Sequence, residues 1–122
     1  MTSVLVVDDN DRNRKLALDV LSAAGFRTFG AATAAQGIAL AREHVPDVIL
    51  MDLRLPDMDG GDAARSLGDA ARTAQIPVVA LTSLRLDDDG DLLAASGFAG
   101  YLEKPFRVRE LADEVRRYCG ES

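Results

Sequence analysis

The chain has 122 residues, 48% hydrophobic and 28% charged, a composition that predicts one globular domain over residues 1–122 and argues against disorder. A net charge of −6 and a pI of about 4.6 give no electrostatic basis for direct binding to nucleic acid or to an anionic membrane. Cys119 is the only cysteine, which excludes an intrachain disulfide, and no apolar run approaches the roughly 20 residues of a membrane span. We therefore expect a cytoplasmic protein.

The amino-terminal part begins with a strand followed by a helix. Val4–Val7 is a continuous aliphatic run, typical of a strand that is buried on both faces. The next segment places apolar residues on one face of a helix, which Gly25 is expected to end; these residues are Leu16, Ala17, Val20, Leu21 and Ala24. Asn10 or Asp11 could cap this helix, as could the pair Asp8 and Asp9. Phe26–Ala31 is the expected second strand.

The middle of the chain repeats this pattern. Thr33 and Gln36 have the spacing of a capping box, which predicts the start of a helix that Pro46 stops. Val48–Met51 is the expected third strand. After a Pro-Asp-Met-Asp-Gly-Gly turn, a helix is predicted from a thin apolar stripe of Ala63, Ala64, Leu67, Ala70 and Ala71.

The last part supplies two more strands and two more helices. The segment IPVVALTS, residues 76–83, is the expected fourth strand, and Pro77 suits its first position better than its middle. Asp87–Ser96 has a weak helical pattern, and Phe98–Leu102 is the expected fifth strand. A final helix is predicted from the apolar face Val108, Leu111, Val115 and Tyr118.

This alternation predicts an α/β fold in which a doubly wound, five-stranded parallel sheet is covered by helices on both faces. Ligands bind such sheets at the carboxyl ends of the strands, where the strand order reverses. In the flavodoxin-like order 2-1-3-4-5, the first and third strands flank that point. Four of the five predicted strands have groups that can do chemistry at or just past their carboxyl ends: Asp8 and Asp9, then Asp52, then Thr82, then Lys104.

Asp8, Asp9 and Asp52 are therefore expected to converge. Three carboxylates at close range repel one another unless a cation lies among them, and all-oxygen ligands suit Mg²⁺. A carboxylate can also attack phosphorus to form an aspartyl phosphate. The charge of the transferring phosphoryl group would then need stabilising, which Lys104 and the hydroxyl of Thr82 could provide.

Four segments carry a resemblance to a known family: VVDDN, DVILMDLRLPDMDG, VVALTS and GYLEKPF. Each is common alone, but all four in this order are highly specific. Over its whole length the chain resembles a response-regulator receiver domain of two-component signalling, which is a signalling switch and not an enzyme with a separate substrate. The resemblance implies that Asp52 accepts a phosphoryl group from a histidine kinase or a phosphotransfer protein. It also implies Mg²⁺ bound by Asp8, Asp9, Asp52 and the main-chain carbonyl of Arg54.

The same resemblance implies how the phosphoryl group is handled and reported. Asp52, Thr82 and Lys104 would be the catalytic groups, and Thr82 and Tyr101 would be the switch pair. A downstream protein would bind the fourth helix, fifth strand and fifth helix, and homodimer formation on phosphorylation is a further expected response. No direct contact with nucleic acid or membrane is expected.

Two other function classes use similar parts. A haloacid-dehalogenase-type aspartyl phosphatase generally needs a second acid two residues after its nucleophile, where this chain has Arg54. A flavodoxin-like flavin carrier would need hydroxyls and glycines after the first strand, where this chain has Asp8 and Asp9. Asp57 and Asp59 are interpreted as turn residues without a chemical role. Whether the chain acts alone or as part of a longer protein stays open.

Overall fold

The fold is seen in a computed structural model that describes residues 2–53, 55–58, 60–82, 98–103 and 108–118. Within these ranges, the side chains at positions 60, 61, 82, 101–103, 108 and 109 are outside the description. The helix expected at 87–96 lies outside the described residues.

A five-stranded sheet forms the centre of the molecule, and all of its strand pairs are parallel. The strand order β2-β1-β3-β4-β5 confirms the predicted flavodoxin-like topology. The strands differ from their predicted ranges by one or two residues at the ends; Asp52 is the last residue of the third strand and does not follow it. They are β1 (Ser3–Val7), β2 (Arg27–Ala31), β3 (Val48–Asp52), β4 (Val78–Thr82) and β5 (Gly100–Glu103).

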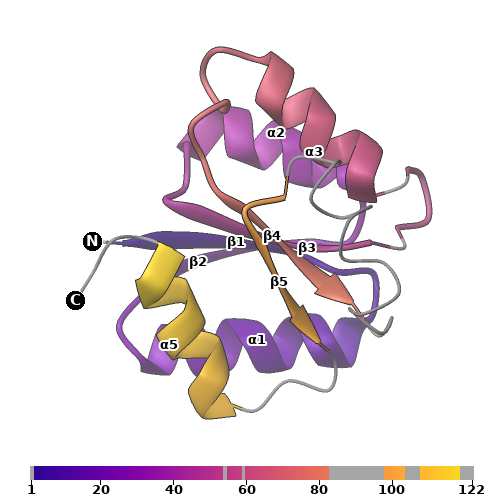
Figure 1. Cartoon of the computed structure of the whole chain (residues 1–122). Coiled ribbons are helices and arrows are strands. Elements are labelled where there is room, and N and C mark those ends of the chain that lie inside the picture. Colours follow the sequence, from indigo (N-terminus) through magenta and orange to yellow (C-terminus); the bar gives the residue numbers. More distant parts are fainter. Residues whose placement is uncertain (1, 54, 59, 83–97, 104–107, 119–122) are drawn as a thin grey trace.

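Helices cover both faces of this sheet. Figure 1 shows α1 and α5 on one face and α2 and α3 on the other. The described helices are α1 (Asp11–Ala23), α2 (Ala34–His44), α3 (Gly60–Asp69) and α5 (Val108–Tyr118).

The side chains of β1 and β3 alternate between two apolar layers, one on each face of the sheet. Val4 and Val6 pack into the layer that contains α1 and α5, whereas Leu5 and Val7 pack into the layer that contains α2 and α3. The neighbouring residues Val48–Met51 divide in the same way, and all of these side chains are 0% exposed. The prediction of strands buried on both faces is therefore confirmed.

The helix ends follow local sequence signals. Gly25 has a φ of 97° directly after α1, and its N–H donates to the Ser22 carbonyl at 3.1 Å while the N–H of Phe26 donates to Leu21 at 3.0 Å. This pattern is a Schellman motif, which needs a residue with positive φ and explains why glycine ends the helix. Helix α2 ends at His44, two residues before Pro46, as predicted.

Helix α3 is shorter than its alanine stripe suggested. It ends at Asp69, so Ala70 and Ala71 lie beyond it. The hydroxyl of Thr73, which is 1% exposed, donates to the Leu67 carbonyl at 2.6 Å. That bond satisfies a carbonyl of the last helical turn and fixes the chain in a series of turns before β4.

Helix α2 approaches β1 closely at Gly37. A Cβ built on Gly37 would lie 2.6 Å from Cγ2 and 3.2 Å from Cγ1 of Val7. Val7 is fully buried and β-branched, so it cannot easily rotate away. Gly68 in α3 has no neighbouring atom within 4 Å of such a Cβ.

We expect the alanine substitutions at these two glycines to have opposite effects on stability. Gly37→Ala should lower the free energy of unfolding, because overpacking costs about 1–3 kcal/mol and outweighs the gain in helix propensity. Gly68→Ala should raise it by up to about 1 kcal/mol, since only propensity changes. Urea denaturation of the two variants and the wild type measures both effects. Equal stabilisation by both substitutions would contradict the close packing of α2 on β1.

Candidate functional site

Three carboxylates meet at the carboxyl ends of β1 and β3. The register of the two strands pairs Val7 with Met51, so the residues that follow, Asp8 and Asp52, lie at the same edge of the sheet. Asp8, Asp9 and Asp52 each place a carboxylate oxygen within 4.8 Å of the others. Asp8 is 1% exposed and Asp52 is 9% exposed, whereas Asp9 is exposed to solvent. We call these three residues the acidic cluster.

Two hydrogen bonds hold Asp8, one made by its main chain and one by its carboxylate. Its N–H donates to the Ala31 carbonyl of β2 at 3.0 Å, and its carboxylate accepts from the N–H of Asn10 at 2.9 Å. Asn10 is the N-cap of α1, since its side chain accepts from the N–H of Asn13 at 3.0 Å. Neither Asp8 nor Asp9 therefore serves as the cap of this helix.

Asp52 takes its position from the sheet. It is the last residue of β3 and lies opposite Leu81 of β4, and the N–H of the next residue, Leu53, donates to the Leu81 carbonyl at 3.3 Å. Hydrogen bonding between the two chain segments thus continues one residue past Asp52, which fixes the main chain that carries its carboxylate.

The other predicted site residues are described in part or not at all. The main chain of Thr82 ends β4, and the main chain of Tyr101 pairs with Ala80 in β5, while both side chains lie outside the described part. Arg54 and Lys104 lie outside the described residues altogether.

The acidic cluster has the donor chemistry of a hard divalent cation. All three side chains offer carboxylate oxygens, and their mutual repulsion at this distance is relieved by a bound positive charge. Mg²⁺ prefers oxygen ligands and commonly takes one or two carboxylates together with water. The residues present therefore fit such an ion.

A family model described as the response regulator receiver domain matches residues 4–116. The chain belongs to this family. A receiver domain is a phosphoacceptor switch of two-component signalling, and this assignment removes the aspartyl phosphatase and the flavin carrier as alternatives.

Relatives and solved structures agree with the assignment to the receiver family. The polar-differentiation response regulator DivK of Brucella ovis is 34% identical over 120 residues, covering 98% of each chain. The chemotaxis response regulator CheY4 of Vibrio cholerae has a TM-score of 0.91 at 28% identity, covering 97% of this chain and 98% of that one. The receiver domain of a sensor histidine kinase from Pseudomonas aeruginosa has a TM-score of 0.89 at 32% identity, covering 98% of each chain, and its structure has a magnesium ion coordinated in the active site cleft.

Among the helices that the structure describes in this receiver domain, none has both the length and the apolar character needed to span a membrane.

Asp57 has a structural role that the sequence interpretation missed. Its carboxylate accepts from the N–H of Ala34 at 2.8 Å and from the N–H of Ala35 at 2.9 Å, both in the first turn of α2. The Thr33 hydroxyl accepts from the N–H of Gln36 at 3.2 Å, as the capping box predicted. Together, Asp57 and Thr33 satisfy the three N–H groups at the start of α2, and Asp57 ties the loop after Asp52 to this helix.

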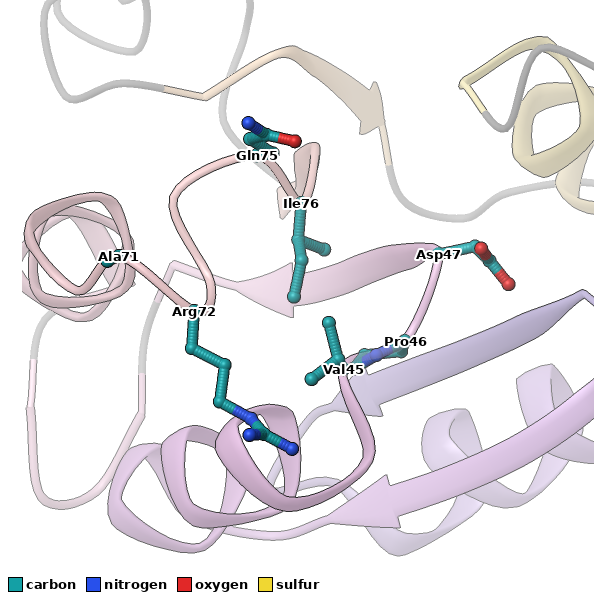
Figure 2. A pocket seen from close by; sticks show the side chains of 7 residues that line it. All are labelled: Val45, Pro46, Asp47, Ala71, Arg72, Gln75 and Ile76. Carbon is teal, nitrogen blue, oxygen red and sulfur yellow. The ribbon is translucent and has the colours of Figure 1, made fainter.

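A hollow of about 350 Å³ lies away from the acidic cluster, next to the start of β3. Figure 2 shows Val45, Pro46 and Asp47 on one side of it and Ala71, Arg72, Gln75 and Ile76 on the other. Asp47, which lines this hollow, accepts with its carboxylate from the Ser3 N–H at 2.8 Å and fixes the start of β1. This contact gives Asp47 a structural role at the opposite edge of the sheet.

The Asp57 contact should make stability depend on pH. The N–H groups of Ala35 and Ala34 lower the pKa of the Asp57 carboxyl from its ordinary value of 3.8. The stabilisation is therefore complete above the unfolded pKa and is lost as pH falls through the lower folded pKa. Asp57→Ala should reduce the free energy of unfolding at neutral pH, and the difference from wild type should shrink in acid below pH 3.8.

Denaturant titrations across this pH range measure the difference, with Asp19→Ala, which removes an exposed acid of α1, as the control. A gap between wild type and Asp57→Ala that does not change with pH would show that the charged cap is not its cause.

Proposed function

We propose that residues 1–122 form one receiver unit that accepts a phosphoryl group on Asp52 from a histidine kinase or a phosphotransfer protein. The observation that carries this proposal is the position of Asp52 at the end of a central strand, with oxygens of Asp8 and Asp9 within 4.8 Å. The receiver family supplies the class of reaction.

Among the three acids, Asp52 is best suited to be the nucleophile. Its main chain lies between two paired neighbours, β1 and β4, so its carboxylate is held in a defined place. Asp8 is more deeply buried, with 1% of its surface exposed against 9% for Asp52. Asp9 is exposed on the loop after β1. A nucleophile gains most from such positioning because the reacting atoms must be held in line.

The transfer forms one bond and breaks one bond. A carboxylate oxygen of Asp52 attacks phosphorus, the N–P bond of the donor phosphohistidine breaks, and its electron pair stays on the imidazole nitrogen. We assign Lys104 to pair with the negative charge of the transferring group and the hydroxyl of Thr82 to donate a hydrogen bond to it. The main chain of Thr82, at the end of the strand next to β3, supports this assignment.

We assign the cation site to Asp8, Asp9 and Asp52, with the main-chain carbonyl of Arg54 as a further ligand. The acidic cluster supports this assignment, as does the magnesium ion coordinated in the Pseudomonas aeruginosa receiver domain. When bound, Mg²⁺ would neutralise charge on the cluster and on the phosphoryl group.

We assign the switch to Thr82 and Tyr101, whose main chains lie on the paired strands β4 and β5. Such a switch requires that the phosphoryl group contact two conformations of the protein differently, because a ligand shifts an equilibrium only by its differential affinity. The downstream partner is then a protein that binds the fourth helix, β5 and α5. The cytoplasmic location and the homodimer expected from the sequence stay predictions.

Asp52→Asn should abolish labelling by acetyl phosphate in the presence of Mg²⁺. The amide cannot act as the nucleophile, so intact-protein mass spectrometry should find no added phosphoryl group. Asp57→Asn is the matched control, because it removes an acid of the same loop whose carboxylate contacts α2. Retained stoichiometric labelling of Asp52→Asn would assign the phosphoryl group to another residue.

Mg²⁺ should raise the melting temperature of the wild type and raise that of Asp9→Ala much less. A ligand that binds only the folded state adds about 2.7 kcal/mol of stability at about 100 times its Kd. Differential scanning calorimetry with increasing Mg²⁺ measures the rise. Asp19→Ala, with the same loss of charge on α1, should respond as the wild type does. An equal rise in Asp9→Ala would place the ion elsewhere.

A further inference from the structure

Arg14 of α1 joins the acidic loop to the helix that follows it. Its Nη1 donates to the main-chain carbonyl of Asp8 at 2.8 Å, and its Nη2 donates to the Asp11 carboxylate at 2.6 Å. The planar guanidinium group can make both bonds at once, which a lysine ammonium group cannot do with the same geometry.

Strand β2 leaves room for this side chain. A Cβ built on Gly30 would lie 3.4 Å from Cδ of Arg14 and 2.8 Å from Cδ1 of Leu18. The aliphatic part of Arg14 thus crosses β2 where the strand has no side chain, and the Arg14 side chain is only 22% exposed. Packing of this kind restricts the rotamers of Arg14 and holds its guanidinium group near Asp8.

The bond to Asp8 fixes the peptide group that leads into Asp9. The carbonyl of Asp8 and the N–H of Asp9 belong to the same planar unit. In the described part of the chain, the Asp9 carboxylate has no hydrogen bond or ion pair of its own. Its place therefore depends on the main chain on either side, which Arg14 and the hydrogen bond between Asn10 and Asp8 hold.

The positive charge of Arg14 does not by itself favour the binding of a metal ion to the acidic cluster. A positive group beside three carboxylates weakens their attraction for a metal ion. Asp11 largely offsets this effect, because its carboxylate lies 2.6 Å from the Nη2 of Arg14. The pair thus supplies one hydrogen-bond donor to the Asp8 carbonyl, the Nη1 of Arg14, and little net charge.

We propose that Arg14 is a positioning residue of the acidic cluster, which holds the peptide between Asp8 and Asp9 so that Asp9 is in place before a cation binds. The proposal rests on the proposed function, in which this cluster holds Mg²⁺. Groups that orient the ligands of a metal typically change its affinity by about 10- to 100-fold when they are removed.

The test measures the Kd of Mg²⁺ by calorimetry with the full chain and four variants, together with Asp9→Ala as the check on the metal site itself. Arg14→Ala should weaken binding about 10-fold. Arg14→Lys keeps the charge but not the planar fork, so its Kd should lie between those of Arg14→Ala and the wild type. Arg12→Ala removes the same charge from an exposed position in the same turn, and its Kd should be unchanged or slightly lower.

The fourth variant separates positioning from a general loss of stability. Thr73→Ala removes the buried hydroxyl that bonds Leu67, away from the acidic cluster, and should lower the melting temperature without changing the Kd. Weaker binding in both Thr73→Ala and Arg14→Ala would attribute the effect to destabilisation and overturn the proposal. Unchanged or tighter binding in Arg14→Ala alone would also overturn it. If the wild type itself does not bind Mg²⁺, or Asp9→Ala binds it equally well, the proposed function fails and the role of Arg14 fails with it.

Discussion

The parallel pairing of β1 with β3 is the interaction on which the site depends. Val4–Val7 pair with Val48–Met51, and all of these residues are fully buried between two apolar layers. A slip of one residue would move every side chain of a strand into the opposite layer, so the close packing of differently shaped side chains in both layers opposes it. The relative position of Asp8 and Asp52 follows from that register, and the core thereby determines the geometry of a polar site.

The acids of this chain fall into structural and clustered groups. Asp47 and Asp57 each accept hydrogen bonds that tie two segments together: the start of β1 to the start of β3, and the loop after β3 to α2. Asp11 accepts from Arg14 within α1. Asp8, Asp9 and Asp52 instead direct oxygens toward one another. Close carboxylates cost stability, and the buried core of the sheet offsets that cost. The fold thus places this repulsion where a bound cation can relieve it.

The sequence allowed three features to be predicted: the positions of the strands, their order and the meeting of the three acids. Apolar periodicity can be read from short segments, and the order then follows from the rules for parallel sheets. The cap that Asp57 gives to α2 could not be predicted, since the two lie 23 residues apart and Pro-Asp-Met-Asp-Gly-Gly also has the composition of an ordinary turn. The contact of Arg14 with Asp8 was missed because a charged residue on the first turns of a helix is usually a surface residue. The early end of α3 was missed because its alanine stripe continues to Ala71, whereas the Thr73 hydroxyl that donates to the Leu67 carbonyl lies beyond the stripe.

The cap from Asp57 has a consequence for exchanging parts between relatives. Helix α2 has no acid in its own first turn, so the negative group that complements its dipole comes from another loop. A chimera that brought in a new loop after β3 without an acceptor at position 57 would leave two N–H groups of α2 without that partner. An exchange between relatives must therefore keep the residue at position 57 together with the start of α2, although the rest of α2 and all of β3 lie between them in the chain.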